Sequence, residues 1–247
     1  MAVTISGTTA LVTGANRGIG RALVQALLER GATRVYAGAR RPETLADLVE
    51  TSGGRVVPLQ LDVTNASDIA AAASVATDVS LVINNAGVVS RADAPFTDVQ
   101  WLVAGREEYE VNALGPLAVT QAFAPVLARQ GGGAVANVAS VVSFVSFPLA
   151  ATYSASKAAT HSITQWTRQA LRDQGTYVAG VYPGPIDTDM AADIPLEKTS
   201  ARDAAHAILD GLSRGDEDIL PDPTAKQMGA LFFSGPKQLE TPAPVAA

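Results

Sequence analysis

The sequence contains no cysteine and only two histidines, His161 and His206. Without thiols the chain forms no disulfide, thiolate nucleophile or thiolate metal site, and two separated histidines are too few for a metal centre, so no metal is expected. Dense runs of lysine or arginine are also missing, and the net charge is −6 with a pI near 4.9. An acidic chain of this kind is not expected to bind nucleic acid or an anionic membrane surface.

The amino terminus lacks the features of a secretory signal. Residues 1–7 contain neither a basic segment nor an apolar one, so we expect a cytoplasmic protein. Residues 131–156 carry no charge and are long enough to cross a bilayer. Asn137, Pro148 and several serines interrupt that stretch, which favours a buried strand followed by a loop. We therefore expect no membrane partner.

The chain is rich in alternating strand-like and helix-like patterns. Hydrophobic residues make up 47% of its 247 residues, enough for the core of one large α/β domain. No linker or internal repeat divides it, and the alternation predicts a doubly wound parallel sheet in a single domain, 1–247. Residues 189–199 have no clear period and are predicted to form a substrate lid, and the Pro/Ala-rich C-terminal tail is predicted to fray.

The first apolar run, 9–13, ends in a glycine-rich turn. Gly14, Gly18 and Gly20 follow it in a G-x-x-x-G-x-G spacing, and a helical pattern begins at Arg21. A turn without Cβ atoms lets backbone N–H groups and the helix N-terminus approach a pyrophosphate. Plain tight turns also use glycine, but the position directly after the first strand favours a dinucleotide site.

The residues after the second strand, 34–38, indicate which dinucleotide binds. In an NAD-binding unit an acidic residue about 20 positions after the glycines binds the ribose 2′-hydroxyl. Here Ala39 stands 19 residues after Gly20. Arg40 and Arg17 instead offer two guanidinium groups for a 2′-phosphate, which favours NADPH over NADH. Either arginine alone would be explained as a solvated surface charge.

Polar residues also follow the later strands. Asp62 and Val63 end the third strand and are candidates for contact with an adenine ring. Asn85 follows the fourth strand, where its side chain can cap backbone groups, and Ala86 and Gly87 leave room for a cofactor. Capping alone would also explain the asparagine.

A long helix is predicted over residues 107–130. Pro116 and Pro125 should bend or break it, because proline removes a backbone donor and clashes with the preceding turn. Asn112 lies near the break, where its amide and a freed carbonyl could hold a water on a proton path. A satisfied core amide is the simpler explanation.

Tyr153 and Lys157 lie four residues apart in a predicted helix over 152–174, so their side chains share one face. A lysine cation beside a phenol favours the phenolate and lowers the phenol pKa from about 10 toward neutrality. Ser140, just after the fifth strand, supplies a hydroxyl donor for a polarised carbonyl oxygen. A lone Y-x-x-x-K is frequent by chance, so the three residues alone would indicate only an amphipathic helix and its loop.

Taken in order, these motifs resemble the short-chain dehydrogenase/reductase family along nearly the whole chain. The resemblance implies a Rossmann-like fold with strand order 3-2-1-4-5-6-7, and hydride transfer between a nicotinamide and a carbonyl or alcohol. The matching residues are Thr13, Gly14, Gly18, Gly20, Asp62, Asn84, Asn85, Ala86, Gly87, Asn112, Ser140, Tyr153, Lys157, Pro183 and Gly184.

The resemblance also implies a role for each residue. Tyr153 would be the general acid in reduction, and Lys157 would bind the nicotinamide ribose and lower the pKa of Tyr153. Ser140 would orient the carbonyl, and Asn112 would hold the water of a proton relay. Thr188 would contact the nicotinamide carboxamide. The implied NADP(H) site comprises Gly14, Asn16, Arg17, Gly18, Ile19, Gly20, Arg40, Asp62, Val63, Asn85, Ala86, Gly87, Tyr153, Lys157, Pro183, Gly184, Ile186 and Thr188.

We therefore expect an NADPH-dependent reductase of a ketone or aldehyde. The side chains beside the catalytic segment are mostly apolar, which favours an apolar or aromatic carbonyl compound, although Arg91 could bind an acid. Two alternatives stay open, namely an NADP-linked alcohol dehydrogenase working oxidatively and a non-catalytic NADPH-binding sensor. The expected pocket residues are Val88, Val89, Val141, Phe144, Phe147 and Met190.

The resemblance weakens toward the C-terminus. Tetrameric family members end in a glycine-containing strand that pairs across a subunit interface, whereas residues 216–223 are acidic and interrupted by proline. This difference argues against the usual tetramer. The outer face of the Tyr153 helix offers small residues and Trp166 for helix packing, which leaves a homodimer open.

Overall fold

The computed structural model describes residues 2–90 and 94–235. These residues form nine strands, all of them in parallel pairs. The strands are β1 (Thr9–Thr13), β2 (Arg34–Ala39), β3 (Val56–Gln60), β4 (Leu81–Asn84), β5 (Ala134–Val138), β6 (Tyr177–Val181), β7 (Ile186–Asp187), β8 (Thr199–Ser200) and β9 (Asp218–Ile219).

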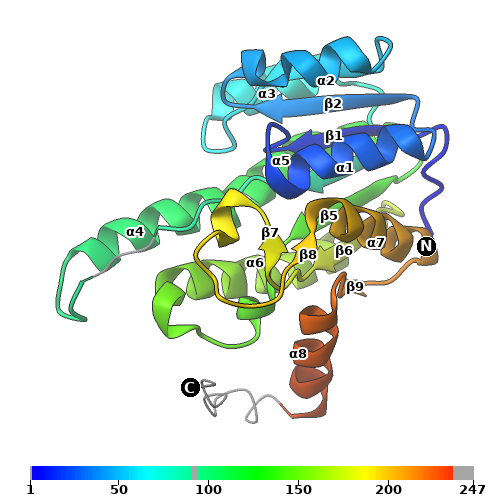
Figure 1. Ribbon diagram of the computed structural model, residues 1–247. Helices are drawn as coiled ribbons and strands as arrows, with labels where there is room; N and C mark the ends of the chain where they lie inside the picture. Colours follow the sequence, from blue (N-terminus) through cyan, green and yellow to red (C-terminus); the bar gives the residue numbers. More distant parts are fainter. Residues whose placement is uncertain (1, 91–93, 236–247) are drawn as a thin grey trace.

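Seven of these strands form one sheet in the order β3-β2-β1-β4-β5-β6-β9 (Figure 1). The predicted doubly wound sheet and its strand order are confirmed, with β9 in the seventh place. The short strands β7 and β8 form a separate two-stranded sheet.

Helices cover both faces of the sheet (Figure 1). Helices α1, α2 and α7 share one hydrophobic core, and α3 and α5 share the core of the other face, where α6 also packs. Short 3₁₀ turns are η1 (Pro42–Leu45), η3 (Val141–Ser143), η4 (Pro148–Ala150) and η5 (Asp189–Ala191). The α-helices are α1 (Gly18–Glu29), α2 (Ala46–Thr51), α3 (Ala66–Val75), α4 (Gln100–Tyr109), α5 (Gly115–Arg129), α6 (Ala151–Ala170), α7 (Ala201–Arg214) and α8 (Pro223–Ser234).

The central strands are buried on both faces. In β1, Leu11 belongs to the core under α3 and α5, whereas Ala10 and Val12 belong to the core under α1 and α7. Successive side chains of a strand point to opposite faces, so a strand covered on both sides must be apolar at every position. This is why these strands are continuous apolar runs in the sequence.

The strand order reverses at β1, which pairs with β2 on one side and with β4 on the other. The chain leaving β1 enters α1 on one face, and the chain leaving β4 continues toward α4 on the other. A crevice opens between them at the carboxyl edge of the sheet, the usual ligand site of such folds. The arrowheads of β1 and β2 in Figure 1 point to this edge.

The predicted long helix begins earlier than expected, at Gln100, and is interrupted by the π-helical turn η2 (Glu110–Leu114). Pro116 explains the interruption, because it has no N–H to donate to the carbonyl of Asn112. The hydroxyl of Thr160 on α6 donates to that carbonyl instead, at 2.8 Å. Helix α5 continues through Pro125, so the predicted break occurs only at the first proline.

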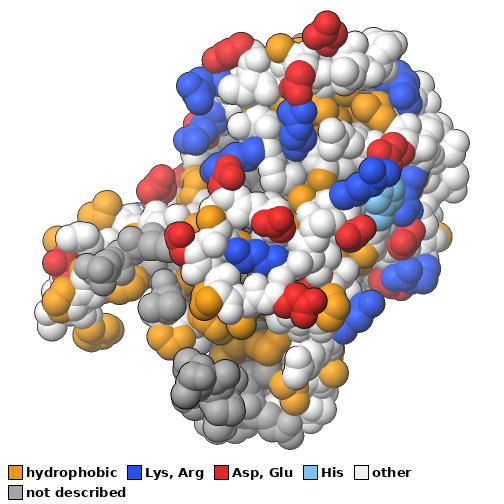
Figure 2. Space-filling model, viewed as in Figure 1, with side chains coloured by type: hydrophobic (Ala, Val, Ile, Leu, Met, Phe, Trp, Pro, Cys, Tyr) orange, Lys and Arg blue, Asp and Glu red, His pale blue; other side chains and the backbone are white. Residues whose placement is uncertain are grey.

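Residues Gln100–Arg129 are long and apolar enough, by length and composition, to cross a membrane, but half of their most apolar window is buried in the protein. A core helix of a globular domain passes the same test. The α4 end projects from the body as an arm (Figure 1). Hydrophobic side chains lie along this arm in Figure 2. Leu102 and Val103 of α4 are exposed.

Two predictions concern the segments near the C-terminus. The predicted lid, 189–199, begins with the turn η5 and ends at β8, which pairs with β7. After β9 the chain forms α8, a helix that the sequence prediction missed. Asp222 caps α8 by accepting from the Ala225 N–H at 2.9 Å, and Pro223 occupies its first position. The frayed tail predicted beyond it falls on 236–247, outside the described residues.

Candidate active site

The glycine turn is packed tightly against the residues after β4. A Cβ atom on Gly20 would overlap the carbonyl oxygen of Gly14 and the side-chain amide of Asn85. A Cβ on Gly14 would lie 2.8 Å from the Cα of Ala86. Both positions therefore require glycine for space, and Gly14 also has a φ of 64°.

Asn85 and Thr13 fasten the two sides of the crevice together. The Thr13 hydroxyl accepts from the backbone N–H groups of Asn85 and Ala86, both at 3.0 Å. The Asn85 amide donates to the carbonyls of Thr13 and Gly14 at 2.9 and 3.2 Å. The asparagine thus caps backbone groups and also holds the glycine turn in place. Thr13 is a site residue that belonged to the motif but not to the predicted site.

The N-terminus of α1 suits a phosphate group. Arg17 occupies its N-cap without a side-chain cap, and the first turn holds no acidic residue, so its N–H groups remain available to an anion. Gly18 adopts a φ of 54° beside Thr188, whose Cγ2 would lie 3.2 Å from a Gly18 Cβ. Thr188 is thereby placed next to the turn, and its contact with the nicotinamide carboxamide stays a prediction. Asn16 is half-buried, and Ile19 packs against the core.

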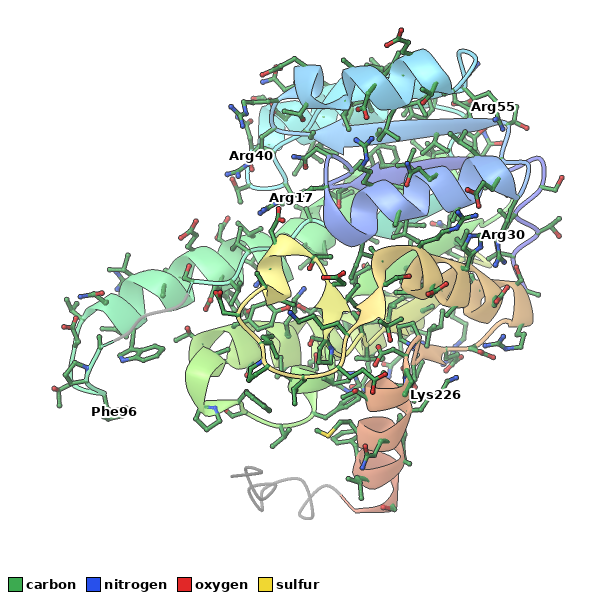
Figure 3. The ribbon with its side chains drawn as sticks, viewed as in Figure 1. Arg17, Arg30, Arg40, Arg55, Phe96 and Lys226 are labelled. Atoms are coloured by element: carbon green, nitrogen blue, oxygen red, sulfur yellow. The ribbon has the colours of Figure 1, made fainter. Side chains whose placement is uncertain are left out.

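The two arginines proposed for a 2′-phosphate have different surroundings. Figure 3 shows both at the carboxyl edge of the sheet, Arg40 after β2 and Arg17 at α1. Arg17 forms an exposed ion pair with Asp189 at 3.2 Å, across the mouth of the crevice. Exposed pairs of this kind contribute little stability and exchange readily with another anion.

Arg40 lowers the pKa of Asp62, which follows β3, through its positive charge. Burial alone would raise the pKa of Asp62, but hydrogen bonds from the Thr64 N–H and hydroxyl, together with Arg40, lower it. The side chain of Val63 is buried against Gly115, whose Cβ would lie 2.7 Å from it, so Val63 offers a ligand its backbone only.

Asn112 is fully buried and its side chain is occupied. Its Oδ1 accepts from the Val88 N–H at 2.8 Å, and its Nδ2 donates to the Val88 carbonyl and the Ser156 hydroxyl, each at 2.9 Å. Both amide donors are thus used within the protein. The side chain of Asn112 anchors the segment after β4 to η2, and its role as the holder of a relay water stays a prediction.

Lys157 and Gly87 meet beside Asn112. A Cβ on Gly87 would lie 3.2 Å from Asn112 Oδ1 and 3.5 Å from Lys157 Nζ. Lys157 is buried and donates to the Val138 carbonyl at 2.8 Å, and burial lowers its pKa to about 8. Its Nζ lies 5.7 Å from the centroid of the Tyr153 ring.

Tyr153, the predicted general acid, interacts with Ser140, the predicted carbonyl-orienting residue. Ser140 is buried and donates to the Pro183 carbonyl at 3.3 Å. Tyr153 is partly exposed, yet burial raises its pKa to about 12. The hydrogen bond with Ser140 lowers this pKa, and the charge of Glu108 raises it further. The predicted decrease is therefore wrong in sign, because the loss of solvation exceeds the stabilisation of the phenolate.

The turn after β6 closes the site from the other side. Pro183 accepts from the Val141 N–H at 3.1 Å as well as from Ser140. The Gly184 N–H donates to Asp222 at 2.8 Å, and Ile186 is buried in β7. Helix α8 thus contributes through Asp222 to the position of this turn.

A cleft of about 430 Å³ opens beside these residues. Val88, Val89 and Met190 line it as predicted, but Val141, Phe144 and Phe147 are not among its lining residues. Phe144 is wrong as a pocket residue because its ring stacks on Phe232 of α8 at 4.5 Å and is buried. The cleft is more polar than predicted, since its lining is completed by Arg17, Ser90, Glu107 and Asp189. Arg91 lies outside the described residues.

Glu108 is a site residue that the sequence prediction missed. It is fully buried, its Oε1 accepts from the Ser90 N–H at 2.7 Å, and its charge acts on Tyr153. Its position four residues before Asn112, in a helix, was the available signal that it shares the face of that residue.

The arrangement can be compared with known proteins. A family model described as short chain dehydrogenase matches residues 8–199. An uncharacterized oxidoreductase of Staphylococcus aureus is 33% identical over 214 residues, which cover 83% of this chain and 90% of that protein.

Solved structures are also similar. A short chain dehydrogenase from Burkholderia cenocepacia, in complex with NADP, superposes with a TM-score of 0.89 at 40% identity, and the match covers 97% of this chain and 100% of that one. A short chain dehydrogenase/reductase from Burkholderia phymatum, in complex with NAD, gives a TM-score of 0.81 at 23% identity and 99% coverage of both chains. The second likeness concerns the fold alone.

Replacement of Gly20 by alanine tests the glycine turn as a dinucleotide cradle. The added Cβ cannot fit between Gly14 and Asn85, so we expect dinucleotide binding to weaken at least about tenfold and stability to fall by about 1–3 kcal/mol. Fluorescence titration and urea denaturation measure the two effects.

Gly211→Ala is the matched control, because its Cβ would crowd Ile219 at 2.8 Å, far from the turn. It should lower stability without changing the dissociation constant of the folded protein. Unchanged binding in Gly20→Ala would show that the turn does not hold the cofactor.

Proposed function

Because the chain belongs to the short-chain dehydrogenase family, we propose that it is an NADPH-dependent reductase that converts an apolar or aromatic ketone or aldehyde into an alcohol. The observation that carries the proposal is the convergence of Ser140, Tyr153 and Lys157 at the sheet edge where the glycine turn lies. Family membership supports a nicotinamide cofactor and oxidoreductase chemistry, and the identity of the substrate and the direction belong to the proposal.

The residues of this chain divide the reaction between them. The bound nicotinamide supplies the hydride. Ser140 and Tyr153 hold the carbonyl oxygen by hydrogen bonds that strengthen as negative charge develops on it. Tyr153 then transfers its phenolic proton to that oxygen, since a phenol with a raised pKa is protonated at neutral pH and serves as the acid. Lys157, a buried cation beside the ring, stabilises the phenolate that is left.

The preference for NADPH rests on the residues after β2. Ala39 is buried where an NAD-binding unit carries an acid, and Arg40 follows it on the surface. Arg17 forms an exposed ion pair with Asp189, and a phosphate group could replace Asp189 as its partner. The complex of the similar Burkholderia cenocepacia protein with NADP supports the same choice.

The cleft supports a substrate that is apolar on one side. Val88, Val89 and Met190 are its apolar lining residues, while Ser90 and Glu107 add polar atoms to the lining. An NADP-linked alcohol dehydrogenase working oxidatively uses the same catalytic residues, whereas a sensor without turnover could lose Tyr153 or Lys157. The enzyme is favoured because buried Lys157 and Ser140 are costly to keep unless they serve a reaction.

We also propose a cytoplasmic location.

We further propose a homodimer. An apolar groove on α5 and α6 contains Leu117, Ala124 and the half-exposed Trp166, and a second copy of the chain would cover this groove. Sedimentation at micromolar concentration is expected to give a dimer that Trp166→Glu dissociates, and a wild-type monomer under those conditions would contradict it.

The reductase is tested by the loss of NADPH absorbance with a panel of aryl, cyclic and aliphatic ketones and aldehydes. We expect turnover of some apolar members, and Tyr153→Phe should lower that turnover by about 10²- to 10⁴-fold because the proton donor is lost. NADPH binding by Tyr153→Phe should stay near the wild-type value. Turnover that survives in this variant would contradict the assignment of Tyr153, and tight NADPH binding without turnover of any compound would favour the sensor.

Arg40→Asp tests the cofactor preference. The substitution removes a cation and adds an anion, so we expect binding of NADPH to weaken about tenfold or more relative to NADH. Arg41→Asp, the same change one residue later, is the control and should affect both cofactors little. Equal weakening of NADPH and NADH by Arg40→Asp would contradict the proposed phosphate contact.

A further inference from the structure

The interface between α4 and α6 contains a carboxyl group that the proposed mechanism does not use. Glu108 on α4 is 0% exposed. Its Oε1 accepts from the Ser90 N–H at 2.7 Å, whereas its Oε2 has no hydrogen-bond partner in the described part of the chain. Burying a carboxyl group with one oxygen unsatisfied is costly, and native proteins rarely do so without a function.

The helix geometry directs Glu108 toward Tyr153. A Cβ on Gly105 would lie 3.2 Å from the Cγ2 of Thr152, so α4 and α6 touch at this level. Glu108 follows Gly105 by three residues and therefore lies on the same face, one turn further along. Tyr153 follows Thr152, and its interaction with the charge of Glu108 agrees with this placement.

The bond to Ser90 does not by itself require a carboxyl group. A glutamine would accept from the same N–H and would bring no charge into the interface. The hydroxyl of Thr152 in the same interface is also buried and has no hydrogen-bond partner within the described residues. A glutamate differs from a glutamine at this position in its negative charge, which raises the pKa of Tyr153.

We propose that Glu108 is a positioning residue for the reaction. Its carboxyl group does not line the cleft, and its negative charge favours the protonated form of the Tyr153 phenol. This inference rests on the proposed function of Tyr153. Ser90, which Glu108 holds, lines the cleft, so the carboxyl group lies next to the site without touching the substrate. Lys157 on α6 favours the phenolate and Glu108 on α4 opposes it, and the balance between them sets the pH range in which Tyr153 is an acid.

Among residues 2–90 and 94–235, few titratable groups surround the phenol. Lys157 faces it from α6, Glu108 from α4, and Glu107 lies beyond Ser90, 3.4 Å from its hydroxyl. Glu107 belongs to the cleft lining, so its own substitution would alter substrate binding as well. Glu108 is thus the group whose charge can be removed without changing the cleft surface.

Glu108→Gln tests the proposal, because it keeps the acceptor for Ser90 and removes the charge. A negative charge raises the pKa of Tyr153, so its removal must lower it. Reduction requires the protonated phenol, and its rate should therefore decline at a lower pH than in the wild type. Oxidation of the product alcohol requires the phenolate and should rise at a correspondingly lower pH. KM at neutral pH should change little, because the cleft surface is the same.

A titration without turnover separates this proposal from the proposed function. Tyrosine is replaced throughout by fluorotyrosine, whose fluorine lowers the phenol pKa and gives an NMR signal, and Tyr153→Phe identifies the signal of residue 153. In Glu108→Gln that signal should titrate at lower pH, whether or not any substrate is known. Glu110→Gln, an exposed change two residues later, is the control and should leave the titration in place.

Two results would overturn the proposal. One is a titration of residue 153 that coincides in wild type and Glu108→Gln, since the carboxyl group would then not act on the phenol. The other is a pH profile of reduction that is the same in wild type and Glu108→Gln, since Glu108 would then serve only as the acceptor for the Ser90 N–H. Absence of turnover in the wild type would contradict the proposed function and leave the NMR titration to decide on Glu108.

Discussion

The structure depends on the pairing of β1 with both β2 and β4. Parallel pairing requires each connection to cross one face of the sheet, and the reversal at β1 sends neighbouring connections to opposite faces. The crevice left between them is where Gly14 and Asn85 meet. Hydrogen bonds from Asn85 and Ala86 to Thr13 keep its two sides together, so the same contact that stabilises the sheet edge also shapes the site.

Polar groups inside the domain connect the sheet to α6, the helix that carries Tyr153 and Lys157. Asn84 donates to Asn137 at 2.8 Å, and Asn137 donates to Thr164 of α6 at 3.0 Å, all in buried positions. Buried hydrogen bonds with fixed geometry allow one arrangement of the elements that carry them. Through them the register of β4 and β5 fixes where α6 lies, and thereby where Tyr153 and Lys157 lie relative to the crevice.

The electrostatics of the site come from burial more than from sequence neighbours. Lys157 and Tyr153 both lose solvation, which moves their pKa values apart, lowering that of Lys157 to about 8 and raising that of Tyr153 to about 12. Burial therefore favours the neutral form of each group, and neighbouring charges make smaller contributions to the pKa shift. One such neighbour, Glu108, belongs to a helix whose start the sequence placed several residues too late.

The sequence alone determined the parallel, doubly wound sheet and the glycine turn, because apolar runs on buried strands and glycine in a turn leave few physical alternatives, and the strand order followed from the resemblance to a known family. The order of the motifs added the family and the roles of Ser140, Tyr153 and Lys157. Only the tertiary structure decided what depends on packing between distant segments: the burial of Phe144 under α8, the pairing of Arg17 with Asp189, and the occupation of the Asn112 amide. The sign of the pKa change at Tyr153 belongs to the same group, since solvation depends on every element around a residue and not on its neighbours in the chain.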